Sequence, residues 1–169
     1  MSFDCCTENA SLTDRVLTEG VKVHCPRLKL LSLGELDKVQ SSGIQGLFTG
    51  WVNQGLTALN LHRVLPLEND AMLAILAHSG STLEVLDVHS CDELCDEGLA
   101  TLARSAPRLR SLDVSFVRAI DDFFIRDALD NMPELETLFV HGDNRVSDAC
   151  PQRRGVRIRG QENSASFDT

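Results

Sequence analysis

Long apolar runs are missing from this 169-residue sequence, and so is the start of a secretory signal. The longest apolar run, Ala71–Ala77, is far below the ~18–20 residues that a membrane-spanning helix needs. The opening letters MSFDCCTENA contain neither a basic region nor an apolar core. We therefore expect an intracellular protein whose six cysteines are free thiols in a reducing compartment.

The motifs of common catalytic sites are absent from the sequence as well. There is no glycine-rich phosphate loop, no G-x-S-x-G nucleophile motif and no H-E-x-x-H metal motif. Zinc sites usually take two close ligand pairs, but no clean second pair accompanies Cys91 and Cys95. The sequence therefore predicts no enzymatic activity, no cofactor and no metal site.

Positive charge is scarce outside the last residues of the chain. The formal net charge is −9, yet residues 151–169 carry four arginines against Glu162 and Asp168, which leaves −11 on the other 150 residues. A body this acidic repels a phosphate backbone at long range. The charge distribution therefore argues against extensive direct contact with nucleic acid.

The sequence does contain a repeat that extends along most of the chain. The pattern L-x-x-L-x-[L/V] occurs five times, and its first leucines are 28, 27, 26 and 26 residues apart: Leu28, Leu56, Leu83, Leu109 and Leu135. A mostly small or apolar column lies three residues after the last aliphatic of each pattern: Leu36, Val64, Cys91, Val117 and Asp143. An aliphatic column lies six residues after it: Val39, Leu67, Leu94, Ile120 and Val146.

A repeat of this kind is typical of leucine-rich-repeat proteins. The L-x-L alternation predicts a short strand with one buried face, and a unit that cannot bury this face alone stacks on its neighbours. We predict an α/β horseshoe-shaped solenoid with parallel strands on the concave face and short helices on the convex face. Three aspartates precede helical patterns and are the expected N-caps: Asp70, Asp96 and Asp122. Three prolines are expected to follow helices: Pro26, Pro107 and Pro133.

We expect a single leucine-rich-repeat domain over residues 1–160, with about six repeats and degenerate ends. The segment Leu12–Leu17 matches the back half of a repeat, whereas Met1–Cys6 makes a poor strand. The polar letters of residues 161–169 predict a disordered tail.

A C-terminal cap is predicted at residues 144–160. Cys150 and Pro151 correspond to Cys25 and Pro26, and the same offsets place a seventh strand in the letters GVRIRG. Arg153 then stands in the column of the first leucine.

Strand residues that point away from the core are the candidate binding residues, because solenoids mostly serve as extended binding surfaces. We predict partner contacts on the concave face at nine positions: Asn60, His62, Val85, Asp87, His89, Ser111, Asp113, Phe139 and His141. The column of Val85 and Ser111 is apolar to small, and the column beside it is acidic at Asp87 and Asp113. An exposed apolar strip beside an acidic one favours a protein-binding groove.

Two pairs on this face admit alternatives. His62 and His89 are expected on adjacent strands about 4.8 Å apart, as in a metal or pH-sensitive site, but we favour exposed positions because no second set of ligands converges on them. Asp87 and Asp113 are also expected to be neighbours, and like charges there are mildly destabilising. Either a basic partner relieves this repulsion or solvent tolerates it.

Four arginines near the end are candidates for contact with phosphates or with an acidic partner: Arg153, Arg154, Arg157 and Arg159. Pairing with the acidic body of the protein itself is the alternative. We favour protein contacts over phosphate contacts because the rest of the chain is strongly acidic.

Three closing segments resemble one family more specifically. They are Asp113–Phe123 (D-V-S-F…D-D-F), Gly142–Asp148 (G-D-N-R-V-S-D) and Cys150–Val156 (C-P-x-R-R-G-V). Over roughly residues 20–160 the chain resembles the leucine-rich-repeat subunit of the fungal nucleotide-excision-repair damage sensor, the radiation-sensitive-seven family. The resemblance implies a non-enzymatic nuclear subunit that works with a Snf2-type ATPase in global-genome repair, similar to substrate receptors of elongin–cullin ubiquitin ligases.

Two other hypotheses stay open at this point. The repeat alone is shared by F-box substrate adaptors and mitotic-exit antagonists, so a generic adaptor of that kind is the alternative function. Direct binding of damaged DNA through the four arginines is a third hypothesis. The chain has no room before its first repeat for the family's ligase-docking box or zinc-finger-like segment, so we expect a fragment or a truncated gene model.

Overall fold

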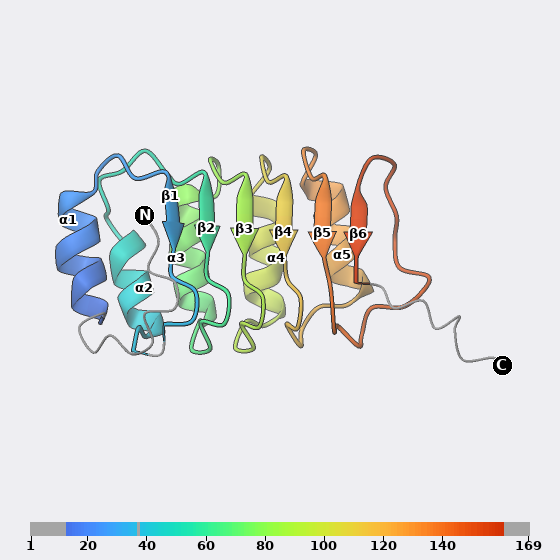
Figure 1. Cartoon of the computed structure of the whole chain (residues 1–169). Coiled ribbons are helices and arrows are strands. Elements are labelled where there is room, and N and C mark those ends of the chain that lie inside the picture. Colours follow the sequence, from blue (N-terminus) through green and yellow to red (C-terminus); the bar gives the residue numbers. More distant parts are fainter. Residues whose placement is uncertain (1–12, 37, 161–169) are drawn as a thin grey trace.

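Six short parallel strands lie side by side in chain order in one sheet (Figure 1). The computed structural model describes residues 13–36 and 38–160, so the predictions for Met1–Cys6 and for the tail lie outside the described residues. The strands are β1 (Leu30–Ser32), β2 (Ala58–Asn60), β3 (Val85–Asp87), β4 (Ser111–Asp113), β5 (Thr137–Phe139) and β6 (Arg157–Arg159). Each strand pairs with the next one in the chain, as expected for stacked repeats.

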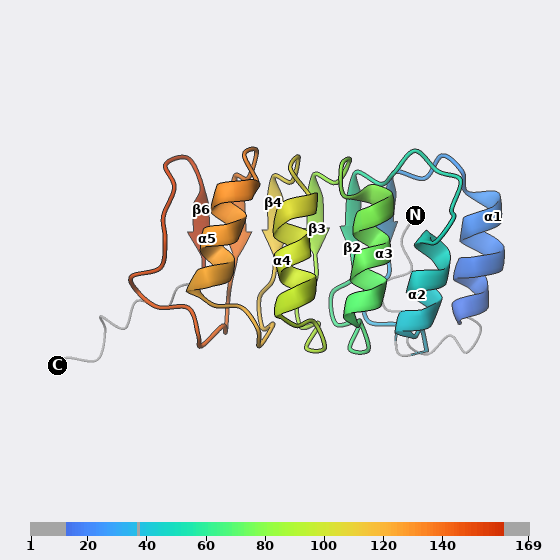
Figure 2. The same cartoon turned by 180° about the vertical axis from the view of Figure 1, so that it is seen from behind.

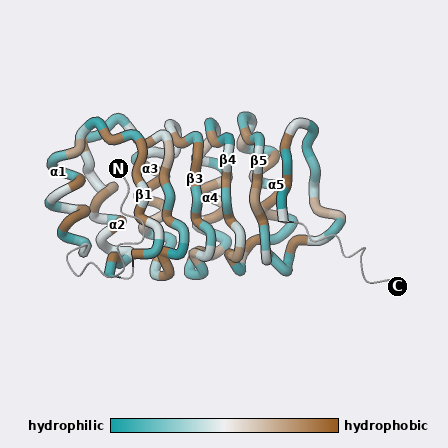
Figure 3. The backbone as a smooth tube through the Cα atoms, viewed as in Figure 1, coloured by the Kyte–Doolittle hydropathy of each residue, from teal (hydrophilic) through white to brown (hydrophobic). Residues whose placement is uncertain are grey.

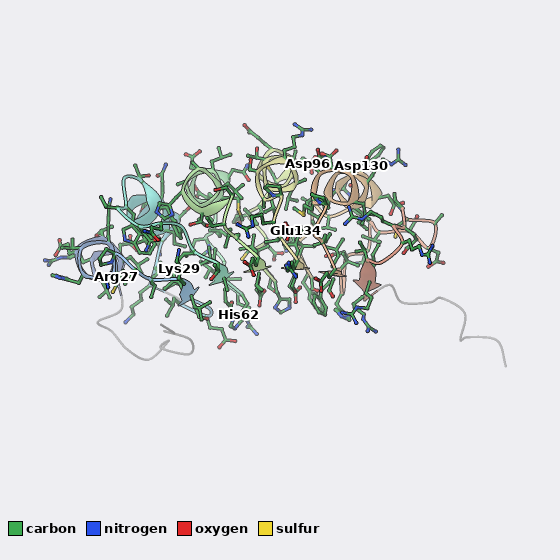
Figure 4. The ribbon with its side chains drawn as sticks, turned by 90° about the horizontal axis from the view of Figure 1, so that it is seen from above. Arg27, Lys29, His62, Asp96, Asp130 and Glu134 are labelled. Atoms are coloured by element: carbon green, nitrogen blue, oxygen red, sulfur yellow. The ribbon has the colours of Figure 1, made fainter. Side chains whose placement is uncertain are left out.

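Helices cover one face of this sheet (Figure 2). They are the π-helix η1 (Val16–Val21) with α1 (Lys22–His24), then α2 (Ser41–Phe48), α3 (Asn69–Ser79), α4 (Asp96–Ser105) and α5 (Asp122–Asn131). Viewed from above, the helices form the outer side of a shallow arc and the strands its inner side (Figure 4). The predicted α/β leucine-rich-repeat solenoid is confirmed. Among the described residues, no helix has the length and apolarity to cross a membrane.

The core lies between the two layers and is built from the predicted columns. The central residue of each strand points into it, and these residues face one another in register: Leu31, Leu59, Leu86, Leu112 and Leu138. The other predicted columns are buried as well, apart from Leu28 and Val146, which are only partly buried. Figure 3 shows the result as hydrophobic stretches that alternate with hydrophilic ones in each repeat.

The predicted helix caps are wrong by one or two residues. Asp96 and Asp122 are the first residues of their helices, Asp70 is the second residue of α3, and none of them is the N-cap. In α5 the N-cap is Asp121, whose carboxylate accepts hydrogen bonds from the N–H groups of Phe123 and Phe124 at 3.0 and 3.1 Å. An aspartate in the first turn still interacts favourably with the helix dipole, which explains the pattern without a cap.

The closing strand forms where the sequence predicts it, without an intervening helix. β6 pairs with β5 and places Arg157 and Arg159 on either side of Ile158, which is partly buried. It is the sixth strand of the described residues, and the prediction of a seventh depends on Met1–Cys6. Each of Pro26, Pro107 and Pro133 follows a helix, as predicted.

Candidate partner-binding face

The strands direct two of their three residues to the concave face. In β3, Leu86 is buried while Val85 is 43% exposed and Asp87 is half-buried. The pairing register places Val85 beside Ser111 and Asp87 beside Asp113 in β4, so the predicted apolar and acidic columns are contiguous rows. His62 lies on the strand side of the molecule, away from the helices (Figure 4). The face thus presents ordered rows of side chains to a partner.

The acidic row also has a structural role that the sequence analysis missed. The side-chain oxygen of Asn60 accepts a hydrogen bond from the N–H of His62 at 2.9 Å. The same bond joins Asp87 to the N–H of His89 at 3.0 Å and Asp113 to the N–H of Ser115 at 2.9 Å. Asn and Asp commonly satisfy the backbone two residues on in this way. These three side chains therefore hold the chain as it leaves each strand.

A second set of hydrogen bonds, between the backbones of consecutive repeats, forms a ladder three residues after each strand. The residue at this position has a left-handed backbone in five successive repeats, with φ between 55° and 71°: Glu35, Arg63, Ser90, Phe116 and Gly142. The N–H of Phe116, for example, donates to the carbonyl of His141 in the next repeat at 2.8 Å. Non-glycine residues adopt this conformation at a cost of roughly 1–2 kcal/mol, so the inter-repeat bonds offset local strain. Only the last of these five positions is glycine, so no glycine pattern in the sequence indicates this conformation.

The histidine column is less uniform than predicted. His141 is exposed, His62 and His89 are half-buried, and Ser115 in the same column is buried, where its hydroxyl accepts from the N–H of His141 at 3.0 Å. The Nδ1 of His62 lies 2.8 Å from the side-chain oxygen of Asn60. Within residues 13–36 and 38–160, no group of three or more His, Cys, Asp or Glu side chains is arranged to hold a metal ion.

Burial disfavours the ionised form of Asp87 in the acidic row. It raises the pKa of Asp87, and the neighbouring Asp113 raises it further, while the N–H of His89 opposes both effects. The charge of Asp87 is therefore less stable here than in water. A basic group of a partner placed between the two carboxylates would favour the ionised form of both.

Aromatic rings gather toward the C-terminal end of the same face. Phe139 and His141 are stacked with ring centroids 6.3 Å apart, and His89 meets Phe116 edge to face at 5.2 Å. Phe116 is 51% exposed. Aromatic side chains of this kind are enriched at the energetic centres of interfaces, so this end of the face is suited to protein contact.

The four arginines are not equivalent in the structure. The guanidinium of Arg153 donates to the carbonyls of Leu129, Met132 and Leu135. Leu129 is in the last turn of α5, and the other two lie between α5 and β5. Arg153 is therefore occupied inside the protein, and contact with a phosphate or an acidic partner remains a prediction for Arg154, Arg157 and Arg159 only. Their exposure is compatible with that prediction.

Asp143 occupies a column that is apolar in the other repeats. It is only 8% exposed, its Oδ1 accepts from the N–H of Val117 at 3.1 Å, and its Oδ2 is buried without a hydrogen-bond donor among the described residues. Burial is the main cause that raises the pKa of Asp143 to about 7, from 3.8 in an unperturbed carboxyl group. The ionised form is thus destabilised in the fold.

We predict that Asp143→Asn stabilises the protein at pH 8. The folded state holds the proton up to about pH 7, whereas the unfolded state releases it near 3.8, so the wild-type free energy of unfolding falls as the pH rises between these values. A neutral amide avoids this penalty, so we expect a gain of about 1–3 kcal/mol at pH 8 that shrinks toward pH 4. Urea unfolding at both pH values measures it. Asp130→Asn, an exposed carboxylate on α5, is the control and should change neither value.

Known proteins resemble this chain in both sequence and fold. No protein-family model matches the chain. It is 36% identical over 148 residues to the DNA repair protein rhp7 of Schizosaccharomyces pombe, and 29% identical over 158 residues to the DNA repair protein RAD7 of Saccharomyces cerevisiae. These matches cover 86% and 91% of the chain. Its fold matches a chain in the crystal structure of the yeast Rad7 and Elc1 complex, with a TM-score of 0.78 and 28% identity over 88% of the chain.

This chain is a Rad7-like leucine-rich-repeat unit. The resemblance inferred from the three closing segments is thereby confirmed. The Rad7-like unit spans about a quarter of the curated relatives, 26% of rhp7 and 28% of RAD7, and 38% of the matched chain in the crystal structure.

Proposed function

We propose that this Rad7-like unit is the non-enzymatic interaction part of a nuclear DNA repair complex. It contributes to global-genome nucleotide-excision repair and to the ubiquitin ligation associated with it. The observation that carries this proposal is the similarity of sequence and fold to Rad7, which has been crystallised in complex with Elc1. The same similarity supports partners of the elongin–cullin class, and we propose a Snf2-type ATPase as a further partner because the family resemblance of the closing segments implies one.

The concave face supports a role in protein binding. Its rows of half-buried acidic, apolar and aromatic side chains are rigidly held by the ladders at the strand ends. Preorganised surfaces bind with a smaller loss of conformational entropy. We therefore assign the partner contact to the nine positions of the concave face, with Val85 near its centre and Phe139 toward its C-terminal end.

The alternatives have less support. A generic F-box-like or mitotic-exit adaptor accounts for the repeat but not for the similarity to two DNA repair proteins. Direct binding of damaged DNA requires a basic surface, yet Arg153 is turned inward and the chain outside residues 151–169 carries −11. Neither alternative matches the combined observations.

A chimaera tests the proposal. We expect that replacing the matching segment of rhp7 with this chain preserves repair of damaged DNA, and that Val85→Glu in the chimaera lowers it at least tenfold, because a third carboxylate beside the acidic row disrupts the partner contact. Survival of fission yeast after DNA damage measures the effect.

Val52→Glu is the matched control for this substitution. Val52 is 86% exposed in the loop between α2 and β2 and is not one of the nine concave positions, so the same change there should leave survival unaltered. Equal survival with Val85→Glu and Val52→Glu would exclude the concave face as the contact surface. Failure of the unmodified chimaera to repair damage would contradict the proposed function itself.

A further inference from the structure

Phe123 is an exposed aromatic residue in a position that is acidic in the neighbouring repeats. It is the second residue of α5, where α3 has Asp70 and α4 has Glu97. Phe123 is nevertheless 77% exposed. A large apolar side chain that departs from the repeat and gains little burial suggests a binding role rather than a contribution to the core.

The next residue, Phe124, also departs from the repeat. The third helix position is small in the earlier helices, where it is Gly43, Ala71 and Gly98. A Cβ at Gly98 would clash with the side-chain oxygen of Asn69, at the start of the preceding helix, so this position faces the preceding repeat. Phe124 therefore places a bulky ring between α5 and α4, where the other helices approach closely.

A cavity of about 420 Å³ lies at this place, between the first turns of α4 and α5. Its lining residues are Asp96, Leu99, Ala100, Ala119, Asp121, Phe123, Phe124, Arg126 and Asp127. Leu99 and Phe124 are buried and contribute an apolar floor. Asp96 lies on the helix side of the molecule (Figure 4), opposite to the concave face. This α4–α5 groove is thus separate from the partner contacts proposed above.

The charges at the rim are of both signs, because Arg126 of α5 also lines the groove, and a cation is favoured only on the α4 side. Asp121 is paired with Arg145 at 3.0 Å and Asp127 with Arg104 at 3.4 Å. Asp96 is exposed at the start of α4, and no ion pair involves it among the described residues. The ring of Phe123 offers a second attraction, because a cation over an aromatic face is stabilised by about 0.5–1 kcal/mol at exposed sites.

We propose that the α4–α5 groove is a second docking site, which takes an apolar side chain of a partner protein that has a lysine or arginine next to it. The apolar side chain fills the floor formed by Leu99 and Phe124. The stem of the basic residue lies along Phe123, and its charge faces Asp96, away from the guanidinium of Arg126 on the opposite helix. The site is independent of the proposed function, since it leaves the concave face free for its own partner.

A displayed library of random 12-residue peptides tests this proposal with the purified chain as bait. We expect the selected peptides to carry a leucine, isoleucine, methionine or phenylalanine beside a lysine or arginine. Phe123→Glu should weaken their binding at least tenfold, as measured by fluorescence anisotropy. This variant restores the residue type of the equivalent position in α4, so it should fold like the wild type, which thermal unfolding verifies.

Two further variants separate the possible outcomes. Asp96→Asn should weaken lysine-containing peptides more than peptides with the lysine replaced by norleucine, whereas Phe139→Glu on the concave face should leave both unchanged. The proposal is overturned if no peptide is enriched, if the enriched peptides are acidic, or if Phe139→Glu rather than Phe123→Glu abolishes binding. A wild-type chain that forms dimers in sedimentation, and a Phe123→Glu chain that does not, would instead assign the groove to a second copy and overturn a basic partner.

Discussion

Replacing Leu112 by alanine should lower the free energy of unfolding by about 2–5 kcal/mol, the range observed for buried leucines. Leu112 is the central residue of β4 and is completely buried. It lies in register between Leu86 of β3 and Leu138 of β5. Truncation therefore leaves a cavity that two neighbouring repeats share and that the flanking strands cannot close without losing their register.

The size of this effect follows from the architecture. In a solenoid each repeat contacts only its neighbours, so stability is close to a sum of repeat and interface contributions. A defect in the middle weakens two interfaces. We therefore expect unfolding to become less cooperative and its urea midpoint to fall. Urea titration followed by circular dichroism measures the change in both midpoint and slope.

Leu65→Ala is the control for Leu112→Ala. Leu65 is 58% exposed in the loop before α3, and its truncation removes the same atoms without opening a cavity. We expect a change within about 0.5 kcal/mol, as for most surface substitutions. Similar losses for the two variants would mean that the leucine column does not form the core.

The periodic part of this fold could be predicted from sequence because its cause is periodic. Each repeat must bury the same face against the next, so aliphatic residues recur where the strand meets the core, as at Leu86 and Leu112. The same argument predicted β6. The leucine pattern is lost there, and the prediction depended only on the spacing of Val156 and Ile158 from Cys150. Burial of a strand face thus leaves a strong pattern even in a degenerate repeat.

Features that depend on backbone geometry could not be predicted in this way. Three residues after each strand, the left-handed residue is Glu35, Arg63, Ser90 or Phe116, and a glycine occupies this position only at Gly142. Bonds to the next repeat determine the conformation there, and the side chain does not. The cap of α5 at Asp121 was missed for a similar reason. Two consecutive aspartates offer equivalent sequence patterns, and only the start of the helix distinguishes them.

The candidate site was predictable as a surface but not in its chemistry. The alternation of strand residues correctly placed Asp87 and Asp113 side by side. The sequence could not show that each carboxylate also accepts a backbone hydrogen bond, which makes these residues structural as well as available to a partner. The exposed Phe123 had a signal that could have been found, since it interrupts an acidic column.

Arg153→Ala should be the second most damaging substitution, with an expected loss of about 2–3 kcal/mol, since hydrogen bonds of charged groups contribute about 1.5–3 kcal/mol. Its guanidinium joins the end of α5 and the turn before β5 to the closing segment through three backbone carbonyls. Removing it takes the charged donor from all three carbonyls, although that of Met132 keeps the N–H of Leu135. β6 is then held by its pairing with β5 and by the packing of Val156 and Ile158 against the core. The backbone N–H of Arg157 donates to the carbonyl of Glu136 at 2.9 Å. We expect this N–H to exchange with solvent faster in the variant.

Two variants decide whether these hydrogen bonds, and not charge or volume, account for the loss. Arg154→Ala removes the adjacent, exposed arginine and should change stability by less than about 0.5 kcal/mol. Arg153→Leu restores the residue type that Leu28 has in the first repeat, and so fills the column without any donor. We expect it to be nearly as destabilised as Arg153→Ala, because an apolar side chain cannot satisfy the carbonyls. A fully stable Arg153→Leu protein would show that Arg153 only fills space, and the closing segment would then be held by packing like every other repeat.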